Sequence, residues 1–326
     1  MQILSLLTLA TTVLSKNIVL TNDDGWAATP IRALYRDLTD AGHNVLMVAP
    51  VTQRSGWSGR FQYSYSKELL EDGQFNYRNK GEPAWGYEED DNKIWYMNGT
   101  PAGCVGFALD VVIPKYFPEL NNSIDLVVGG VNEGVNNSPQ TFTVSGTIGA
   151  TYEAVYRGLP AIAFSGSNSN NSFFKDDLND DPLNPFNIYA KKSVQLIEEI
   201  FTKQGDNDRA LPLGVGLNVN FPKAGYDDET CTNPVYTKSR IAGTDSGAYT
   251  IYLNETTGLL QDGPNDLTQA LGVCYNGPCN YPSETEVVGG KVGHCKSSIS
   301  TFSIDYDANS QLQAEVDSLI GGVFNL

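Results

Sequence analysis

Positive charge and histidine are scarce in this chain of 326 residues. Its 21 lysines and arginines stand against 38 aspartates and glutamates, so the formal charge is −17 at pH 7. A surface of that charge repels nucleic acid and anionic membranes, and we therefore exclude polymeric DNA or RNA and a membrane as partners. A small phosphorylated substrate would also be repelled unless a local positive centre, such as a bound cation, held it.

Signature motifs of several enzyme classes are missing. The two histidines, His43 and His294, lack the Arg-His-Gly context of a histidine phosphoenzyme. No Gly-x-Ser-x-Gly elbow is present, which disfavours a Ser–His–Asp hydrolase. No Gly-x-Gly-x-x-Gly follows the first predicted strand, which disfavours a dinucleotide-dependent enzyme. These absences leave hydrolysis assisted by a metal as a class to consider.

Long apolar runs are also missing. The run from Ile3 to Leu14 is too short to span a membrane. Small residues at Val13 and Ser15 fit a secretory signal peptide cleaved after Ser15, and the alternative is a buried first element. Secretion would agree with five glycosylation sequons, of which Asn170 and Asn254 are the better acceptors. The sequons begin at Asn98, Asn121, Asn136, Asn170 and Asn254.

Cysteines are few and unevenly placed. Cys104 lies in an apolar helical pattern, and we expect a buried free thiol there. Four cysteines fall in the last third of the chain, where two disulfides with three possible connectivities are expected in a secreted protein. Zinc binding is the weaker alternative, because the four cysteines include a single Cys-x4-Cys pair. The four are Cys231, Cys274, Cys279 and Cys295.

The stretch 17–25 is the most informative part of what is present. Ile18 to Leu20 predict a buried strand, which ends in the adjacent carboxylates Asp23 and Asp24 and a glycine. A helical pattern follows Pro30. The two carboxylates have no lysine or arginine directly beside them, so they repel each other unless a cation lies between them. A hard divalent cation is the natural partner.

Strands and helices alternate over most of the chain, which predicts an α/β fold with a mostly parallel sheet. Four polar clusters each follow a predicted strand, and such strand ends meet at one edge of a parallel sheet. The clusters are Asp23-Asp24, Ser55-Gly56, Asn98-Gly99-Thr100, and the segment from Asn132 to Ser145-Gly146-Thr147. Their convergence predicts one cleft built from distant parts of the sequence.

The predicted organisation has three parts. Residues 1–15 are the signal peptide, residues 16–230 a Rossmann-like, three-layer catalytic core, and residues 231–326 a β-rich, disulfide-bearing extension packed on the core. Residues 62–93 are polar and are expected to form an insertion at the sheet edge. We expect β-hairpins beyond Cys231.

Six motifs, in this order, resemble those of the SurE survival-protein family. They are Thr21–Gly25, Val48–Pro50 with Ser55-Gly56, Asn98–Pro101 with Cys104, Gly130–Asn132 with Gly134 and Asn136, Ser145–Thr147, and Leu217–Pro222. The resemblance spans residues 17 to 222. It implies a Rossmann-like fold and a divalent-metal phosphomonoesterase, either a 5′/3′-nucleotidase or an acid phosphatase, that forms a homodimer or larger homo-oligomer. With the signal peptide, a secreted eukaryotic-type member is expected.

Carried over by position, the resemblance implies four oxygen ligands, which suit Mg²⁺ or Mn²⁺. They are Asp23, Asp24, Ser55 and Asn132. The alternatives are a capping role for the aspartates, an ordinary loop serine, and a turn asparagine. Asp23 or Asp24 would orient or deprotonate the water that attacks phosphorus.

A further set is expected to contact the phosphate through glycine backbones and helix N-termini, the alternative being tight turns alone. These residues are Asn98, Gly99, Thr100, Asn136, Ser145, Gly146 and Thr147. The competing function is a secreted nucleotide- or metal-binding module without turnover.

Overall fold

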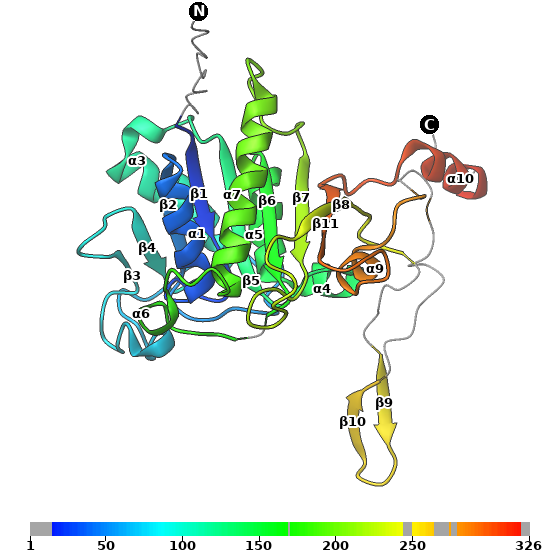
Figure 1. The fold of residues 1–326 in the computed structure, drawn as a ribbon, viewed down its shortest axis with the longest axis horizontal. Helices are drawn as coiled ribbons and strands as arrows, with labels where there is room; N and C mark the ends of the chain where they lie inside the picture. Colours follow the sequence, from blue (N-terminus) through cyan, green and yellow to red (C-terminus); the bar gives the residue numbers. More distant parts are fainter. Residues whose placement is uncertain (1–14, 169, 244–249, 264–273, 275–278, 321–326) are drawn as a thin grey trace, which may run out of the picture.

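The computed structural model describes residues 15–168, 170–243, 250–263, 274 and 279–320. Within these residues a nine-stranded sheet forms the centre of the molecule (Figure 1). From one edge to the other its strands are β3 (Trp85–Tyr87), β4 (Ile94–Met97), β2 (Asn44–Pro50), β1 (Asn17–Thr21), β5 (Leu126–Glu133), β6 (Ala161–Gly166), β7 (Val215–Phe221), β11 (Lys296–Ser303) and β8 (Val235–Lys238). All pairings from β4 to β7 are parallel, whereas β3 and β11 each pair antiparallel with their inner neighbour.

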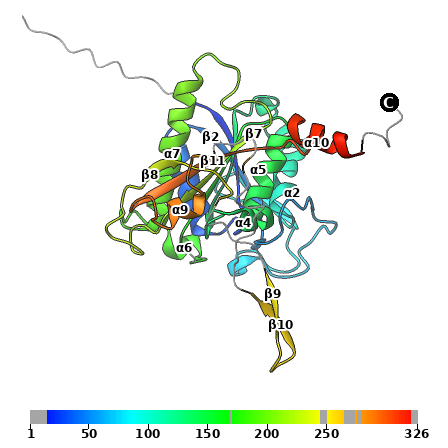
Figure 2. The same cartoon turned by 90° about the vertical axis from the view of Figure 1, so that its right-hand side faces the viewer.

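Helices cover both faces of the sheet, as Figure 2 shows from the side. In β1, Ile18 and Leu20 belong to one apolar core and Val19, between them, to the other. This alternation is that of a strand buried on both faces. The first core is closed by α1 (Thr29–Asp40) and α7 (Pro185–Gln204), and the second by α2 (Pro101–Phe107) and α5 (Gly146–Tyr156). The predicted α/β fold is confirmed.

Shorter elements connect and extend these layers. A π-helical turn at Ala108–Val112 joins α2 to α3 (Ile113–Tyr116). The others are the 3₁₀ turns Gln74–Asn76 and Pro118–Leu120, and the helices α4 (Pro139–Val144), α6 (Phe174–Asp177), α9 (Glu284–Val288) and α10 (Ser310–Ile320). The insertion expected at 62–93 does lie at the edge, where β3 is its short strand.

The end of the chain contains the expected β-hairpin and, in addition, two strands of the central sheet. β11 and β8 extend the central sheet, and the two-stranded hairpin there is β9 (Ile251–Asn254) with β10 (Leu259–Asp262). The two additional sheet strands were not predicted, because polar residues are buried there: Ser300 of β11 pairs in register with Asn218 of β7, and both are buried. Hydrophobic periodicity does not identify such a strand. The division drawn at residue 230 stays a prediction.

Two disulfides are present, as expected, and the structure gives their pairing. Cys231 is bonded to Cys295, and Cys274 to Cys279. Cys104 is a buried free thiol, and burial raises its pKa well above the ordinary value.

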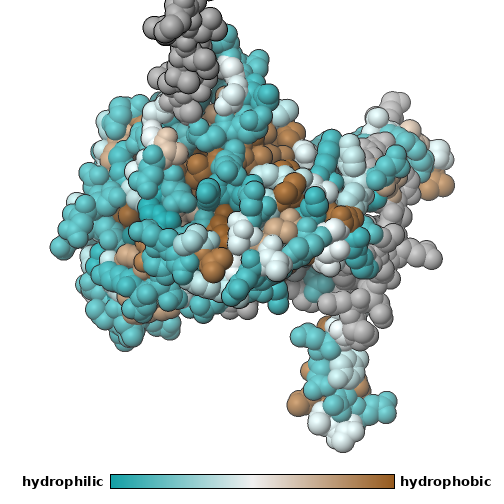
Figure 3. All heavy atoms as spheres, in the orientation of Figure 1, coloured by the Kyte–Doolittle hydropathy of each residue, from teal (hydrophilic) through white to brown (hydrophobic). Residues whose placement is uncertain are grey.

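The hairpin projects from the body of the molecule (Figure 1) and carries apolar side chains that are brown in Figure 3. Ile251, Leu253, Leu259 and Leu260 are each more than half exposed. None of the described helices is long and apolar enough to cross a membrane. Residues 1–14 lie outside the described residues, so the signal peptide stays a prediction.

Candidate active site

The two adjacent aspartates lie directly after β1 and are almost completely buried, with 2% of Asp23 and 1% of Asp24 exposed. Asp23 accepts a hydrogen bond from the backbone N–H of Gly146 (3.0 Å) and another from the hydroxyl of Thr147 (2.7 Å). Both donors belong to the first turn of α5, whose positive end favours a carboxylate. Helix α5 therefore fixes the orientation of Asp23.

Gly146 is required at this contact. A Cβ atom on Gly146 would lie 2.8 Å from the Cβ of Asp23 and 3.1 Å from the ring of Pro101. The first residues of α5 and α2 thus lie close together, and Gly146 of α5 also contacts Asp23. This convergence agrees with the prediction that distant polar clusters meet at one sheet edge.

Only one of the two carboxylate oxygens of Asp24 has a hydrogen-bond partner. Its Oδ2 atom accepts a hydrogen bond from the backbone N–H of Glu133 (2.9 Å), whereas its buried Oδ1 atom has no partner. Burial raises the pKa of Asp24 well above the ordinary value, and the negative charges of Asp23 and Glu133 raise it further. Burial also raises the pKa of Asp23. Without a cation, the site thus disfavours the ionised form of both carboxylates.

Asn132 joins this group through Thr147. The Thr147 hydroxyl lies 2.7 Å from Oδ1 of Asp23 and 3.2 Å from Oδ1 of Asn132. A hydroxyl has one proton, so it serves one of these two acceptors at a time and leaves the other with lone pairs to offer. The Nδ2 group of Asn132 donates to the carbonyls of Glu133 and Gly134, which directs its oxygen towards Thr147.

Ser55 is exposed on the loop after β2, and its side chain makes no hydrogen bond to either aspartate. The loop itself is tied to the site, because the backbone N–H of Arg54 donates to the carbonyl oxygen of Asp23 (2.6 Å). Ser55 therefore lies next in sequence to a residue bonded to Asp23. Its role as a ligand stays a prediction.

Two charged residues at the site were not predicted from the sequence. Arg54 donates from Nη2 to Oδ1 of Asn98 (2.9 Å) and from Nε to the carbonyl of Gly99 (3.2 Å). Both acceptors are neutral, so these contacts leave the positive charge of Arg54 uncancelled. Glu133 is the second residue, and burial together with the charge of Asp23 raises its pKa to about 7. The available signals were the position of Arg54 beside Ser55 and of Glu133 beside Asn132.

Several of the predicted phosphate residues have structural roles in this chain. The Thr100 hydroxyl caps α2 by accepting from the N–H of Gly103, and it also accepts from the N–H of Gln62. Ser145 caps α5 by accepting from the N–H of Ile148. These caps fix the first turns of α2 and α5, and the first turn of α5 contacts Asp23. Contact of any of these residues with phosphate stays a prediction.

Asn136 lies at the end of a buried polar network. Its side chain donates to the Ser165 hydroxyl (2.8 Å), its N–H donates to the side chain of Asn220 (2.7 Å), and its carbonyl accepts from Asn218 (2.8 Å). The same Nδ2 group of Asn218 lies 3.0 Å from both carboxylate oxygens of Glu284, at the start of α9. The part of the chain beyond Cys231 therefore supports the loop that carries Asn136.

The donor set fits a hard divalent cation. Asp23, Asp24, Asn132 and Ser55 offer oxygen atoms, and the unpartnered, buried Oδ1 of Asp24 is the kind of group that a cation satisfies. Nowhere in the described residues, this site included, does a group of three or more His, Cys, Asp or Glu side chains have the arrangement of a metal site. The expected site would thus depend on amide and hydroxyl oxygens in addition to its two carboxylates.

Known proteins are similar to this chain in sequence. The sequence model of the family described as Survival protein SurE matches residues 18–242. An acid phosphatase of Yarrowia lipolytica is 42% identical over 310 residues, which cover 94% of this chain and 84% of the relative. A 5′-nucleotidase SurE of Desulfovibrio desulfuricans is 34% identical over 212 residues, 65% of this chain and 68% of the relative.

The structural likeness agrees with the sequence. The crystal structure of the SurE protein from Aquifex aeolicus matches with a TM-score of 0.61 and 21% identity, covering 93% of this chain and 99% of that one, which shows the fold. The strand-end clusters, the family match over 18–242 and the relatives at 34–42% identity lead to one conclusion. The chain belongs to the SurE family.

Proposed function

We propose that this protein is a metal-dependent phosphoric monoester hydrolase that acts on nucleoside monophosphates, as a 5′/3′-nucleotidase, or more broadly as an acid phosphatase. The observation that carries the proposal is the buried pair Asp23 and Asp24, in which one carboxylate oxygen has no partner. The relatives named acid phosphatase and 5′-nucleotidase SurE support it.

Asp23, Asp24, Asn132 and Ser55 would hold the cation, for which Mg²⁺ or Mn²⁺ is the expected choice. When bound, such a cation lowers the pKa of water and polarises a phosphoryl oxygen. Asp23 is held in place by Gly146 and Thr147. Asp24, whose Oδ1 atom has no hydrogen-bond partner, would orient or deprotonate the attacking water.

The remaining residues would stabilise negative charge on the phosphoryl group. Arg54 adds a positive charge next to Asn98 and Gly99, and the positive end of α5 lies on the side of the site where Asp23 lies. A fixed positive charge of this kind binds the phosphoryl group in the substrate as well as in the transition state. Arg54 would thus supply part of the local positive charge that a phosphorylated substrate needs.

We also propose that the protein is secreted and works as a homodimer or larger homo-oligomer. The two disulfides support an oxidising compartment. The exposed apolar side chains of the β9–β10 hairpin support a contact with a second copy.

The direct test replaces Asp24 by Asn. Phosphate release from AMP and p-nitrophenyl phosphate is measured with Mn²⁺, with Mg²⁺ and with a chelator. We expect the chelator to abolish turnover and Asp24→Asn to lower kcat by about 10²-fold or more, because the variant loses a carboxylate ligand and base. Asp40→Asn, at an exposed aspartate near the end of α1, is the matched control.

Unchanged turnover in Asp24→Asn would remove this residue from the mechanism. Tight AMP binding without phosphate release under any metal would instead favour the binding module.

A further inference from the structure

Residues 133–144, which we call the connecting segment, join the two halves of the candidate site. Before the segment, Oδ1 of Asn132 lies 3.2 Å from the hydroxyl of Thr147. After it, the backbone N–H of Gly146 donates to the carboxylate of Asp23 (3.0 Å). A shift of the connecting segment would therefore move Asn132 and the first turn of α5 relative to the aspartates.

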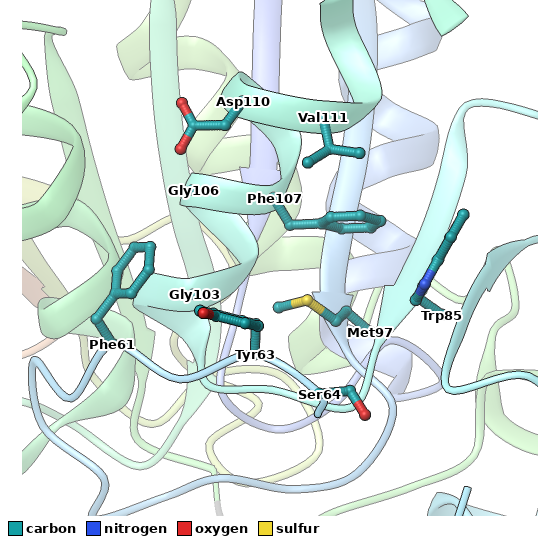
Figure 4. A pocket seen from close by; sticks show the side chains of 10 residues that line it. All are labelled: Phe61, Tyr63, Ser64, Trp85, Met97, Gly103, Gly106, Phe107, Asp110 and Val111. Atoms are coloured by element: carbon teal, nitrogen blue, oxygen red, sulfur yellow. The ribbon is translucent and has the colours of Figure 1, made fainter. Parts of the chain in front are cut away.

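The part of the site nearer to β4 is held by the insertion at the sheet edge. The backbone N–H of Thr100 donates to the carbonyl of Gln62 (3.0 Å), and the N–H of Gln62 donates to the hydroxyl of Thr100 (2.9 Å). Figure 4 shows how Phe61 and Tyr63, on either side of Gln62, lie against α2 and help to line a cavity of about 350 Å³. The connecting segment follows β5, on the opposite side of β1 in the sheet, and is held by a different part of the chain.

Helix α9 contacts the connecting segment directly. The hydroxyl of Thr285 donates to the carbonyl oxygen of Asn137 (2.8 Å), two residues before α4 begins. Figures 1 and 2 show α9 beside α4 in both views. The next residue, Ser138, caps α4 by accepting from the N–H of Thr141 (3.4 Å). The contact thus fixes the point at which the segment enters α4, the helix that leads to Ser145.

A second contact runs through Asn218 of β7. Its Nδ2 group lies 3.0 Å from both carboxyl oxygens of Glu284 and donates to the carbonyl of Asn136 (2.8 Å). An amide nitrogen carries two protons, so Asn218 serves Glu284 and Asn136 at the same time. Glu284 is completely buried. It therefore fixes the rotation of the Asn218 amide, and through that amide it holds the connecting segment one residue before the Thr285 contact.

The strands β8 and β11 hold α9 in turn. The N–H of Glu284 donates to the carbonyl of Arg240 (2.9 Å), and the N–H of Arg240 donates to the carbonyl of Pro282 (3.0 Å). Arg240 follows β8, which pairs with β11 in the central sheet. The helix is thus a fixed support for the site, although it lies beyond the residues that the family model matches, 18–242.

We propose that α9 positions the connecting segment for turnover, with Glu284 and Thr285 as its positioning residues. Both act on the segment at the backbone carbonyls of Asn136 and Asn137, not on the substrate. The proposal rests on the proposed phosphomonoesterase function and assigns a part in it to the chain beyond the family match. A misplacement of about 1 Å can lower a rate about 10²-fold. Removing a group that orients a metal ligand lowers metal affinity or activity by about 10- to 100-fold.

Three threonine variants test the direct contact. Thr285→Val removes the hydroxyl and keeps the shape of the side chain, whereas Thr285→Ser keeps the hydroxyl. At saturating Mn²⁺, we expect Thr285→Val to lower kcat about fivefold for both AMP and p-nitrophenyl phosphate, with KM changed less than about twofold. Thr285→Ser should stay within about twofold of the parent protein. Thr237→Val, at a half-buried threonine of β8, is the matched control and should leave kcat unchanged.

Two variants of Glu284 test the contact through Asn218. Glu284→Gln keeps an oxygen that accepts from Asn218, so we expect kcat within about threefold of the parent protein. Glu284→Ala removes both oxygens, and we expect kcat to fall about tenfold. Because Glu284→Ala also leaves a buried cavity, thermal unfolding is measured for every variant, and the Thr285 variants test the proposal independently of it.

Hydrogen–deuterium exchange, followed by mass spectrometry without metal or substrate, reports the connecting segment itself. We expect the amides of residues 133–138 to exchange faster in Thr285→Val and Glu284→Ala than in the parent protein, and those of β1 to be unchanged. Unchanged exchange together with unchanged kcat would overturn the proposal. Faster exchange with unchanged kcat would overturn it too, because the contacts would then stabilise the segment without serving turnover.

The same measurements separate this proposal from the proposed function. A parent protein that releases no phosphate under any metal would overturn the proposed function, and faster exchange at 133–138 in both variants would still show that α9 holds the segment. Phosphate release at the full rate by Thr285→Val and Glu284→Ala would overturn the positioning role and leave the proposed function standing.

Discussion

At the scale of single residues, the position of charge matters more than its amount. Asp23 and Asp24 were predictable because they interrupt an apolar strand pattern, whereas Arg54 was not, since one arginine in a polar loop is ordinary. Its importance arises from three contacts, with the backbone of Asp23, the side chain of Asn98 and the carbonyl of Gly99. Burial lowers the pKa of its guanidinium, which nevertheless stays charged.

We predict that Arg54→Ala raises KM for AMP about tenfold and changes kcat less than threefold, because it removes a charge that binds phosphate in both ground and transition state. The inhibition constant of inorganic phosphate should rise by a similar factor. Arg60→Ala is the control, since the guanidinium of Arg60 also lies over the ring of Trp57, 5.1 Å from its centroid, but does not hydrogen-bond to Asn98 or Gly99. A fall in kcat with KM unchanged would contradict this assignment.

At the scale of elements, the sequence predicted the alternation of strands and helices and the polar clusters that follow the strands, because apolar periodicity is strong there. It did not predict the short elements β3, α4 and α6. It failed where polar residues are buried. β5 runs on to Glu133 and so includes Asn132, which was expected to follow the strand, and β11 is a sheet strand despite four serines. The link between Asn136 and Glu284, in which Asn218 donates to both, could not be predicted from the sequence either. The two residues are 148 positions apart in the chain.

The contribution of Glu284, at the start of α9, to the stability of the fold depends on pH. It is completely buried and bonded to a neutral amide, and burial raises its pKa to about 8 from an ordinary value of 4.5. Between those values the folded chain keeps a proton that the unfolded chain has lost. The contribution of Glu284 to stability therefore falls as pH rises from about 4.5 to 8, by at most about 1.4 kcal/mol per pH unit.

We predict that Glu284→Gln removes this dependence, since an amide does not titrate. Urea unfolding of both proteins at pH 5, 6, 7 and 8 measures the difference. Relative to the parent protein, the free energy of unfolding of Glu284→Gln should increase at each step towards pH 8. Glu229→Gln, at an exposed glutamate, should show no such increase. Curves that stay parallel over the whole range would mean that Glu284 ionises normally in the fold.

At the scale of the whole molecule, two electrostatic fields oppose each other. The formal charge of −17 repels a phosphate dianion at long range. Arg54 and the expected cation attract it at short range. Salt screens the first field more than the second, because the Debye length falls from about 30 Å at 0.01 M to about 8 Å at 0.15 M ionic strength, while contacts inside the site are shorter than either.

We therefore predict that kcat/KM for AMP rises severalfold between 0.01 M and 0.15 M salt, at a saturating and constant metal concentration. Most enzymes that act on anions use a positive surface and lose rate with salt, so the direction of the change is diagnostic. The affinity for adenosine, which is neutral, provides the control and should stay constant over the same range. A fall in kcat/KM with salt would show that local positive charge dominates the encounter at long range as well, and that the acidic surface faces away from the entrance to the site.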